Sequence, residues 1–322
     1  MKILVTGASG FVGGAFLQRF AARADLQLLG VARRPVALPN YRQVDLSRPF
    51  TLDFRPDAVV HCAALASPWG SDADYRRHNI DATRNVIEFC LANGRPRLVH
   101  VSSSSVFYRH EHQLGLREDS AIGPRFVNQY AATKYASERL VNDYAGEHVI
   151  VRPRAVFGPG DTVLFPRVLT AARRGRLPNL VNDGPPAIGD LVYIDVLTDV
   201  LLRAATTRLP HTSYNITNCE PVVMQDLLRS VLQQLGIAPP RRQVKIATAW
   251  RAAAATEWLY RLLRLRSEPP ITRFGISVFA YSKTFDCTRM LADFGPPAVT
   301  IADGVARFVA WQRAQWRAAG HA

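Results

Sequence analysis

The stretch VTGASGFVGG (residues 5–14) decides the fold, because it joins an apolar run to a helix-like segment through closely spaced glycines. Glycine permits a tight turn and a close backbone approach, so the first N–H groups of the following helix can face a pyrophosphate. At the start of a chain with α/β patterning, this strand–turn–helix context predicts dinucleotide binding. We expect the dinucleotide to contact Gly7, Gly10, Phe11, Val12 and Gly13.

Strand-like and helix-like segments alternate through the first half of the chain. The strand-like runs are short and β-branched, and such runs with helices between them indicate a parallel sheet covered on both faces. We therefore predict an α/β protein with a doubly wound, Rossmann-type parallel sheet. Strands are expected near residues 2–6, 27–32, 57–64, 97–103 and 148–154, and helices near 11–23, 72–93 and 128–140.

The alternation breaks after Arg154, where FGPGD and RLPNL supply turns and loops. We predict that residues 1–155 form the dinucleotide-binding Rossmann domain with the catalytic residues. Residues 156–322 are expected to form mainly a smaller, C-terminal substrate-binding lobe, with some segments returning to the Rossmann sheet. The last helix is expected to begin after a Thr300 cap.

The composition of the 322 residues favours a folded protein in a reducing compartment. The hydrophobic content of 48% is ample for a buried core. The net charge of +14 comes from arginines spread among acidic residues, so we predict no nucleic-acid partner. Four cysteines lack the spacing of a zinc site or a disulfide framework, and we predict no metal. The chain opens on a strand and has no apolar run of membrane-spanning length, so we expect no signal peptide and a cytoplasmic location.

The glycine spacing, Gly-x-x-Gly-x-x-Gly after a threonine, resembles the extended branch of the short-chain dehydrogenase/reductase superfamily. That branch contains epimerases, dehydratases and 3β-hydroxysteroid dehydrogenases, and the resemblance covers nearly the whole chain. VDLSRP resembles the family's Asp-Leu pair beside the adenine, HCAAL its fourth-strand exit, and VRPRAVFGPGD its loop at the nicotinamide. The resemblance implies that the dinucleotide also contacts Asp45, Leu46, Ala63, Ala64 and Pro153.

The cofactor preference is predicted from the end of the second strand, where the chain reads GVARRP. An acidic side chain there would bind the ribose 2′-hydroxyl of NAD, whereas a cation would accept the 2′-phosphate of NADP. Arg33 and Arg34 stand at this position without an acid, which favours NADPH/NADP over NAD. The alternative is that both arginines only face solvent.

Tyr130 and Lys134, in NQYAATKYASERL (residues 128–140), share one face of the predicted helix because they are four residues apart. Hydride transfer to a ketone builds negative charge on its oxygen, so the site needs a proton donor within hydrogen-bond reach. Tyrosine donates poorly at neutral pH unless an adjacent ammonium stabilises its phenolate. With ten tyrosines and four lysines in the chain, a Tyr-x-x-x-Lys match is expected only about 0.1 times by chance. We predict that Tyr130 is the catalytic acid and that Lys134 tunes it and holds the cofactor ribose.

The serines of VHVSSSSVFY follow a predicted strand and supply a third catalytic group, a hydroxyl that bonds the substrate oxygen. In the extended branch this hydroxyl lies three residues before a valine, and the match through Val106 implies Ser103, with Ser104 as the alternative register. Ser104 is then expected to contact the substrate. HNIDATRNV resembles a family helix with an asparagine near the site, which implies Asn79, although an amide on the helix surface is the alternative.

The stretch from residue 269 to 295 resembles the 3β-hydroxysteroid dehydrogenase group, which includes sterol 4-carboxylate dehydrogenases and 2-alkyl-3-ketoalkanoate reductases. PWG (residues 68–70) also resembles the ketoalkanoate reductases. The resemblance implies a bulky, apolar substrate, contacted by Trp69 and by Arg154 beyond the nicotinamide loop. Arginines near the mouth of the site could also meet a substrate carboxylate or a carrier phosphate.

The segment 250–266 combines a stripe of Trp250, Ala254, Trp258 and Leu262 with arginines elsewhere on a predicted helix. Such a basic helix could make peripheral contact with a membrane surface. Packing against the body of the protein or against a dimer partner is the alternative. The family resemblance implies a homodimer.

Together these features predict an NAD(P)H-dependent oxidoreductase that interconverts a ketone and a secondary alcohol, by hydride transfer with a tyrosine as acid and base. The expected group is a 3-keto/3-hydroxy group on a lipid-like, sterol-like or polyketide-like small molecule. One alternative is a nucleotide-sugar 4-epimerase or reductase with bound NAD. Ser104 and Ser105 stand where dehydratases of the branch carry an Asp-Glu pair, which argues against dehydration. Another alternative is a non-catalytic cofactor-binding scaffold, whose known members usually lack the tyrosine or the lysine.

Overall fold

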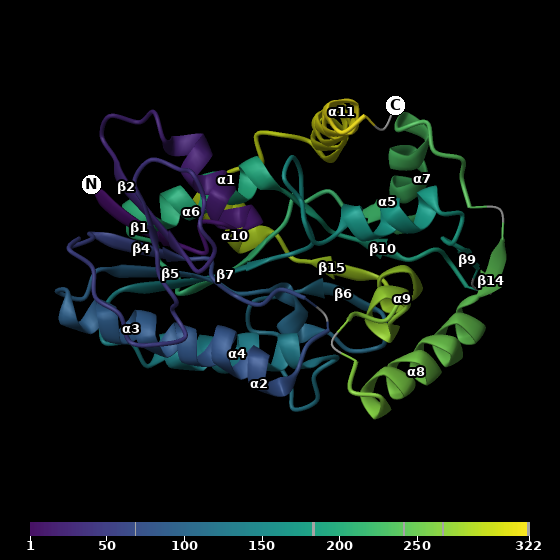
Figure 1. Cartoon of the computed structure of the whole chain (residues 1–322), viewed down its shortest axis with the longest axis horizontal. Helices are drawn as coiled ribbons and strands as arrows, with labels where there is room; N and C mark the ends of the chain where they lie inside the picture. The colour runs from purple at the N-terminus through teal and green to yellow at the C-terminus, as the bar shows by residue number, and fades with distance from the viewer. Residues whose placement is uncertain (68, 182–183, 241, 266, 321–322) are drawn as a thin grey trace.

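A seven-stranded parallel sheet forms the centre of the Rossmann half in the computed structural model (Figure 1). The structure describes residues 1–67, 69–181, 184–240, 242–265 and 267–320. The strands of this sheet are β1 (Lys2–Thr6), β2 (Gln27–Ala32), β3 (Tyr41–Gln43), β4 (Ala58–His61), β5 (Arg97–Val101), β7 (His148–Pro153) and β12 (Ser213–Ile216). Their order is β12-β7-β5-β4-β1-β2-β3, and every neighbouring pair is parallel. The predicted doubly wound sheet is confirmed.

Helices cover both faces of this sheet (Figure 1). On one face lie α1 (Phe11–Phe20) and α6 (Ile194–Thr206), and on the other lie α3 (Ala82–Ala92) and α4 (Gln129–Asn142). Consecutive residues of a strand point to opposite faces, so a strand covered on both sides must be apolar throughout. Ile3, Leu4 and Val5 of β1 are all fully buried, as this rule requires.

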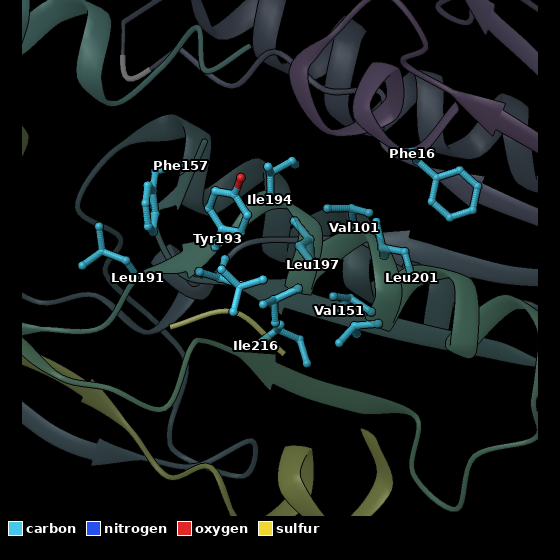
Figure 2. Close-up of a cluster of buried hydrophobic side chains, with 14 of the residues drawn as sticks. Phe16, Val101, Val151, Phe157, Leu191, Tyr193, Ile194, Leu197, Leu201 and Ile216 are labelled. Atoms are coloured by element: carbon cyan, nitrogen blue, oxygen red, sulfur yellow. The ribbon is translucent and has the colours of Figure 1, made fainter. Parts of the chain in front are cut away.

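The larger hydrophobic core lies between the sheet and α6. Figure 2 shows Leu197 and Leu201 of α6 beside Val101 of β5 and Val151 of β7, and all four side chains are buried. This packing holds the carboxyl ends of β5 and β7 in place. In open α/β sheets, ligands bind beyond these ends of the strands.

The predicted helix near 72–93 contains a π-helical turn. It consists of α2 (Asp72–Tyr75), the π turn η1 (Arg76–Asp81) and α3. The Ser71 side chain caps its beginning by accepting a hydrogen bond from the Asp74 N–H. Because a π turn is wider than an α turn, it changes which residues of the helix face the core.

A second sheet extends from the carboxyl edge of the first. Its strands are β6 (Gln113–Leu116), β10 (Ile188–Gly189), β13 (Val222–Val223) and β15 (Lys283–Phe285), in the order β13-β10-β15-β6. The chain crosses between the two sheets in both directions, because β6 precedes residue 155 and β12 follows it. The other elements are η2 (Ser104–Phe107), β8 (Val156–Phe157), α5 (Phe165–Arg173), β9 (Asn179–Val181), β11 (Val192–Tyr193), α7 (Met224–Gln234), β14 (Gln243–Lys245), α8 (Ile246–Leu262), α9 (Arg273–Ala280), α10 (Thr288–Phe294) and α11 (Ile301–Ala318). The Thr300 side chain caps α11, as the sequence predicts.

Helix α8 packs through one narrow face and leaves the other exposed. Ala249, Ala253 and Glu257 are buried, whereas Trp258 and Leu262 are 65% and 61% exposed. The stripe predicted from Trp250 to Leu262 is therefore only half-covered. Residue 266, the last of the predicted segment, and residue 68 lie outside the described part of the chain. No described helix is long and apolar enough to cross a membrane.

Candidate active site

The glycine turn brings the first strand, the first helix and the exit of β4 into close contact. Gly7 has a φ of +69°, and a Cβ on it would lie 2.8 Å from the Ala63 nitrogen. A Cβ on Gly13 would lie 2.6 Å from the Gly7 carbonyl oxygen. Helix α1 begins beyond Gly10, which has no side chain to cap it, so the N–H groups of its first turn are available to a phosphate. The turn therefore fits a dinucleotide pyrophosphate.

The two arginines at the end of β2 are exposed and lie beside this turn. Arg34 donates a hydrogen bond of 2.6 Å to the Ser9 carbonyl oxygen within the turn. Arg33 lies 3.0 Å from His78 Nε2. Both guanidinium groups remain exposed to solvent. The other predicted cofactor contacts Phe11, Val12, Ala63 and Ala64 are half-buried, Leu46 is buried, and Asp45 accepts a hydrogen bond from the Ser47 N–H.

Ser103 and Tyr130 meet at the carboxyl end of β5. The Asn128 side chain caps α4 by accepting from the Ala131 N–H at 2.9 Å, which fixes the first turn that carries Tyr130. Burial raises the pKa of Tyr130, and its hydrogen bond with Ser103 lowers that pKa in part. Ser103 Oγ also accepts hydrogen bonds from the N–H and the hydroxyl of Ser105, which orient it. The structure thus brings together the two predicted oxygen-binding groups.

Lys134 lies one turn further along α4 and is only 1% exposed. Burial lowers its pKa to about 8, although the negative charge of Glu138 raises it. Its Nζ lies 3.3 Å from His100 Nε2, a buried neighbour on β5. Lys134 therefore remains mostly an ammonium ion at neutral pH, with an imidazole as its polar neighbour.

Two buried histidines below Lys134 were not predicted from the sequence. His61 and His100 are paired in register on β4 and β5, and their ring centroids are 5.2 Å apart. Thr6 Oγ1 and Thr83 Oγ1 lie 2.7 Å and 3.0 Å from the two ring nitrogens of His61. Burial lowers the pKa of His61 to about 3 and that of His100 well below its usual value, so both rings are neutral. A polar residue at the same place in two adjacent apolar strands was the signal that could have found them.

A buried ion pair lies beside the histidines. Arg152 of β7 donates to both carboxylate oxygens of Glu138 at 2.9 Å and 2.8 Å, and Ser102 donates to the same carboxylate at 2.5 Å. The two charged side chains are 7% and 1% exposed. Glu138 lies one turn after Lys134 on α4, so this pair fixes the helix that carries Tyr130 and Lys134 against β7.

Asn79 is not on the helix surface, which was the alternative expectation. The π turn places it inside, where it is 1% exposed. Its Oδ1 accepts from the Leu65 N–H at 2.7 Å, and its Nδ2 donates to Thr133 Oγ1 at 3.0 Å. It thus ties the loop after β4 to α4. Its predicted contact with the substrate remains a prediction.

The predicted substrate residues occupy two places. Trp69 lines a cavity of about 40 Å³ together with Asn128 and Phe274, and its ring lies under the Arg261 guanidinium. Ser104 is buried, with its Oγ 3.4 Å from the Tyr108 hydroxyl. Arg154, just beyond Pro153 of β7, lies over the ring of the same Tyr108. Ser104 and Arg154 therefore belong to one neighbourhood, next to Ser103.

These features define a class of enzyme. A glycine turn that can hold a dinucleotide and a serine, tyrosine and lysine at the carboxyl edge of the same sheet are the parts of an NAD(P)-dependent oxidoreductase of the extended short-chain dehydrogenase/reductase type. A family model described as the NAD dependent epimerase/dehydratase family matches residues 3–217. The chain belongs to this family, and the resemblance inferred from its sequence is confirmed.

Known relatives and solved structures agree with this assignment. The chain is 36% identical to a 2-alkyl-3-oxoalkanoate reductase of Stenotrophomonas maltophilia, over 96% of this chain and 99% of the relative. It is 26% identical to a decarboxylating sterol-4-alpha-carboxylate 3-dehydrogenase of Saccharomyces cerevisiae, over 96% and 97%. MoeE5, solved in complex with UDP-glucose and NAD, has a TM-score of 0.73 at 22% identity, and the match covers 98% of this chain and 99% of MoeE5. This last likeness shows the fold.

Proposed function

We propose that the protein is an NADPH-dependent reductase of a ketone that lies beta to a carboxyl group on a lipid-like molecule. The observation that carries the proposal is the place of Ser103, just after β5, against α4, the helix that carries Tyr130 and the buried Lys134. The full-length similarity to a 2-alkyl-3-oxoalkanoate reductase supports the choice of substrate class.

Each catalytic side chain has one role in this reaction. The bound nicotinamide supplies the hydride, which adds to the carbonyl carbon. Ser103 donates a hydrogen bond to the carbonyl oxygen, and Tyr130 transfers its phenolic proton to that oxygen as negative charge develops there. Lys134 holds the ribose and stabilises the phenolate that remains, which then regains a proton from solvent. The alcohol leaves with one hydride and one proton added.

The preference for NADPH over NADH rests on Arg33 and Arg34. Both are exposed beside the glycine turn, and the hydrogen bond from Arg34 to Ser9 holds its guanidinium there. A guanidinium suits a phosphate because it donates two parallel hydrogen bonds. The ribose of NADH offers only a hydroxyl at the same place.

The test follows the loss of reduced-nicotinamide absorbance with NADPH and with NADH. Substrates are 2-alkyl-3-oxoalkanoates, 3-ketosteroids and nucleotide 4-ketosugars. We expect turnover with the first class, and a loss of about 10²- to 10⁴-fold in Tyr130→Phe. Turnover that is unchanged in Tyr130→Phe would overturn the catalytic assignment. An NADH preference would remove only the role of the two arginines.

A nucleotide-sugar epimerase is the second candidate, because the fold also matches that of MoeE5 with UDP-glucose and NAD. An epimerase of this branch keeps NAD tightly bound. Mass spectrometry of the cofactor released from the purified protein separates the two candidates. Stoichiometric NAD would favour the epimerase, and an empty protein that consumes NADPH would favour the reductase.

The exposed end of α8 fits a peripheral contact with membranes, where lipid-like substrates are found. The exposed apolar side chains there are Trp258, Leu259, Leu262, Leu263 and Leu265. Sedimentation with anionic vesicles should be weaker for Trp258→Ser than for the wild type. Equal sedimentation would remove the membrane contact. For the proposed cytoplasmic homodimer, light scattering gives the number of chains directly.

A further inference from the structure

Two buried cations lie against one aromatic ring next to the catalytic serines. Arg154 follows β7 and Lys283 begins β15, far apart in the sequence. Their charged groups lie 5.1 Å and 5.8 Å from the centre of the Tyr108 ring. The two side chains are only 5% and 4% exposed. The Rossmann sheet and the second sheet thus each contribute one positive charge to the same place.

Acids among the residues that the structure describes neutralise these cations only in part. Neither takes part in an ion pair within 4 Å. Arg154 Nε is buried without a hydrogen-bond partner, and Lys283 Nζ donates to the Glu111 carbonyl oxygen. Buried charges without partners are costly, so their presence calls for a counter-charge from outside the chain.

Asp190 is the buried acid of this region, and it can neutralise only one of the two cations. Its Oδ2 accepts a hydrogen bond from the Phe285 N–H at 2.8 Å, and its Oδ1 has no partner. Burial raises its pKa to about 6, although the nearby Arg154 lowers it. Burial also lowers the pKa of Lys283 to about 8, and Arg154 lowers it further, so Lys283 is mostly charged at neutral pH. Among the described residues, Asp190 is thus the one buried acid beside two buried cations, and the Glu111 carboxylate, which raises the pKa of Lys283, is 56% exposed and lies 3.6 Å from Arg109.

The cluster adjoins the place where the substrate carbonyl would bind. The Tyr108 hydroxyl lies 3.4 Å from Ser104 Oγ, and Ser104 follows the catalytic Ser103 directly. Lys283 pairs with Gly189 on β10, and Arg154 Nη2 lies 3.7 Å from where a Cβ on Gly189 would stand. Both cations therefore lie against β10.

We propose that Arg154 and Lys283 bind the carboxylate of the substrate. The proposal rests on the proposed function and deepens it, because it gives the acid group of a 3-oxo acid its own binding site. A guanidinium and an ammonium together suit a carboxylate that accepts several charge-assisted hydrogen bonds. In a 3-oxo acid the carboxylate is separated from the ketone carbon by one carbon atom, so both groups must bind in neighbouring places. Binding of the anion also neutralises the positive cluster.

The test compares a 2-alkyl-3-oxoalkanoate with its methyl ester, which has the same chain and no charge. We expect the wild type to have a kcat/KM for the acid about 10- to 100-fold above that for the ester. Lys283→Met should lower this acid-to-ester ratio about tenfold or more, mainly through KM for the acid, and Lys283→Arg should restore most of it. Lys2→Met, which removes an exposed lysine, is the matched control and should leave the ratio unchanged.

Failure of this proposal and failure of the proposed function give different results. A wild type that reduces acid and ester equally well, or a ratio that neither Lys283→Met nor Arg154→Met changes, overturns the carboxylate site while the reductase assignment stands. A wild type that reduces neither compound overturns the proposed function. In that case, or if the variants do not fold, calorimetric titration with decanoate and with methyl decanoate decides: binding of decanoate alone supports the carboxylate site, and equal binding of both overturns it.

Discussion

Arg152 lies in β7 and Arg154 just beyond its end, and both side chains are buried. Among the described residues, only Arg152 of the two forms a salt bridge with a carboxylate. Arg152 forms two hydrogen bonds with the carboxylate of Glu138 on α4. Arg154 lies over the Tyr108 ring, and its Nε has no partner. The Arg152 guanidinium is neutralised by Glu138, whereas Arg154 has no salt bridge within the described part of the chain and only the nearby Asp190 as an acid, and we propose that a substrate carboxylate completes its charge pairing.

The charges of the Glu138–Arg152 pair are balanced when the protein folds. We propose that the charge of Arg154 is balanced only when the substrate binds. A buried charge with all its hydrogen bonds made holds its neighbours rigidly, and the Glu138–Arg152 pair thereby positions Lys134, one turn away on α4. A buried charge without a partner raises the free energy of the folded protein, and a substrate anion recovers that energy when it binds. Loss of Glu138, which pairs with Arg152, should therefore destabilise the protein, whereas loss of Lys283, the cation beside Arg154, should not.

Glu138→Gln should have the largest effect on stability. It leaves the buried Arg152 without a carboxylate, and breaking a buried pair in this way costs about 3–5 kcal/mol of unfolding free energy. Chemical denaturation measures that cost. Glu147→Gln is the matched control, because Glu147 pairs with Arg97 at the surface and is 55% exposed. The control should lose less than about 1 kcal/mol. If the two variants are equally stable, the buried pair does not hold α4 in place.

The pH dependence of reduction should follow Lys134. Burial lowers its pKa to about 8, so the ammonium is present below that pH and is lost as the pH rises through it. Because the proposed mechanism needs the ammonium to stabilise the Tyr130 phenolate, kcat/KM should fall about tenfold per pH unit above about 8. A pH–rate profile measures the limb. Lys134→Arg keeps its charge throughout this range, so it should be less active but should not lose activity above about pH 8. A fall in kcat/KM above that pH that persists in this variant would assign the titration to another group.

The Rossmann half of the fold was predictable, because strands buried on both faces are apolar throughout and can be found without knowing their partners. The second sheet was not predictable. Its strands have two to four residues each, and β6 pairs with β15 about 170 residues later, so no local pattern marks the pairing. The π turn in the helix near 72–93 also has no local signal, and for this reason Asn79 faces the core instead of the surface.

The candidate catalytic residues could be named from the sequence for a similar reason. Tyr130 and Lys134 are related by helical spacing, and the family resemblance, matched through Val106, selects Ser103 among the four serines after a strand. The contact of Lys134 with His100, and the charged neighbourhood of Arg154, depend on how separate strands are paired in the fold. The sequence indicates these buried polar contacts only by a polar residue inside an apolar strand, as at His61, His100 and Arg152.

Arg33 and Arg34 extend the comparison to exposed cations, whose charges are hydrated by water. Because both are exposed, their substitution should change cofactor binding with little effect on folding. Replacing both by serine should lower the NADPH-to-NADH ratio of kcat/KM about tenfold, the equivalent of one charge-assisted hydrogen bond. Steady-state rates with the two cofactors measure the ratio. Arg42→Ser, an exposed arginine on the neighbouring β3, is the control, and an equal change in that variant would point to general charge instead of a 2′-phosphate site.

Lys283→Met should have the smallest effect on the unfolding free energy. Whether it stabilises or destabilises the protein is the sharpest test of the contrast with Glu138→Gln. Lys283 is 4% exposed and has no ion-pair partner among the described residues, so its removal deletes a buried charge without leaving another one unpaired. Replacing a buried charge by an apolar side chain of similar length is often neutral or stabilising. We expect the unfolding free energy to change by less than about 1 kcal/mol or to rise, in contrast to the loss for Glu138→Gln. Chemical denaturation without substrate measures both variants under the same conditions. A loss of unfolding free energy as large as that of Glu138→Gln would mean that Lys283 stabilises the fold as Arg152 does. The Arg154–Lys283 cluster would then not differ from the Glu138–Arg152 pair.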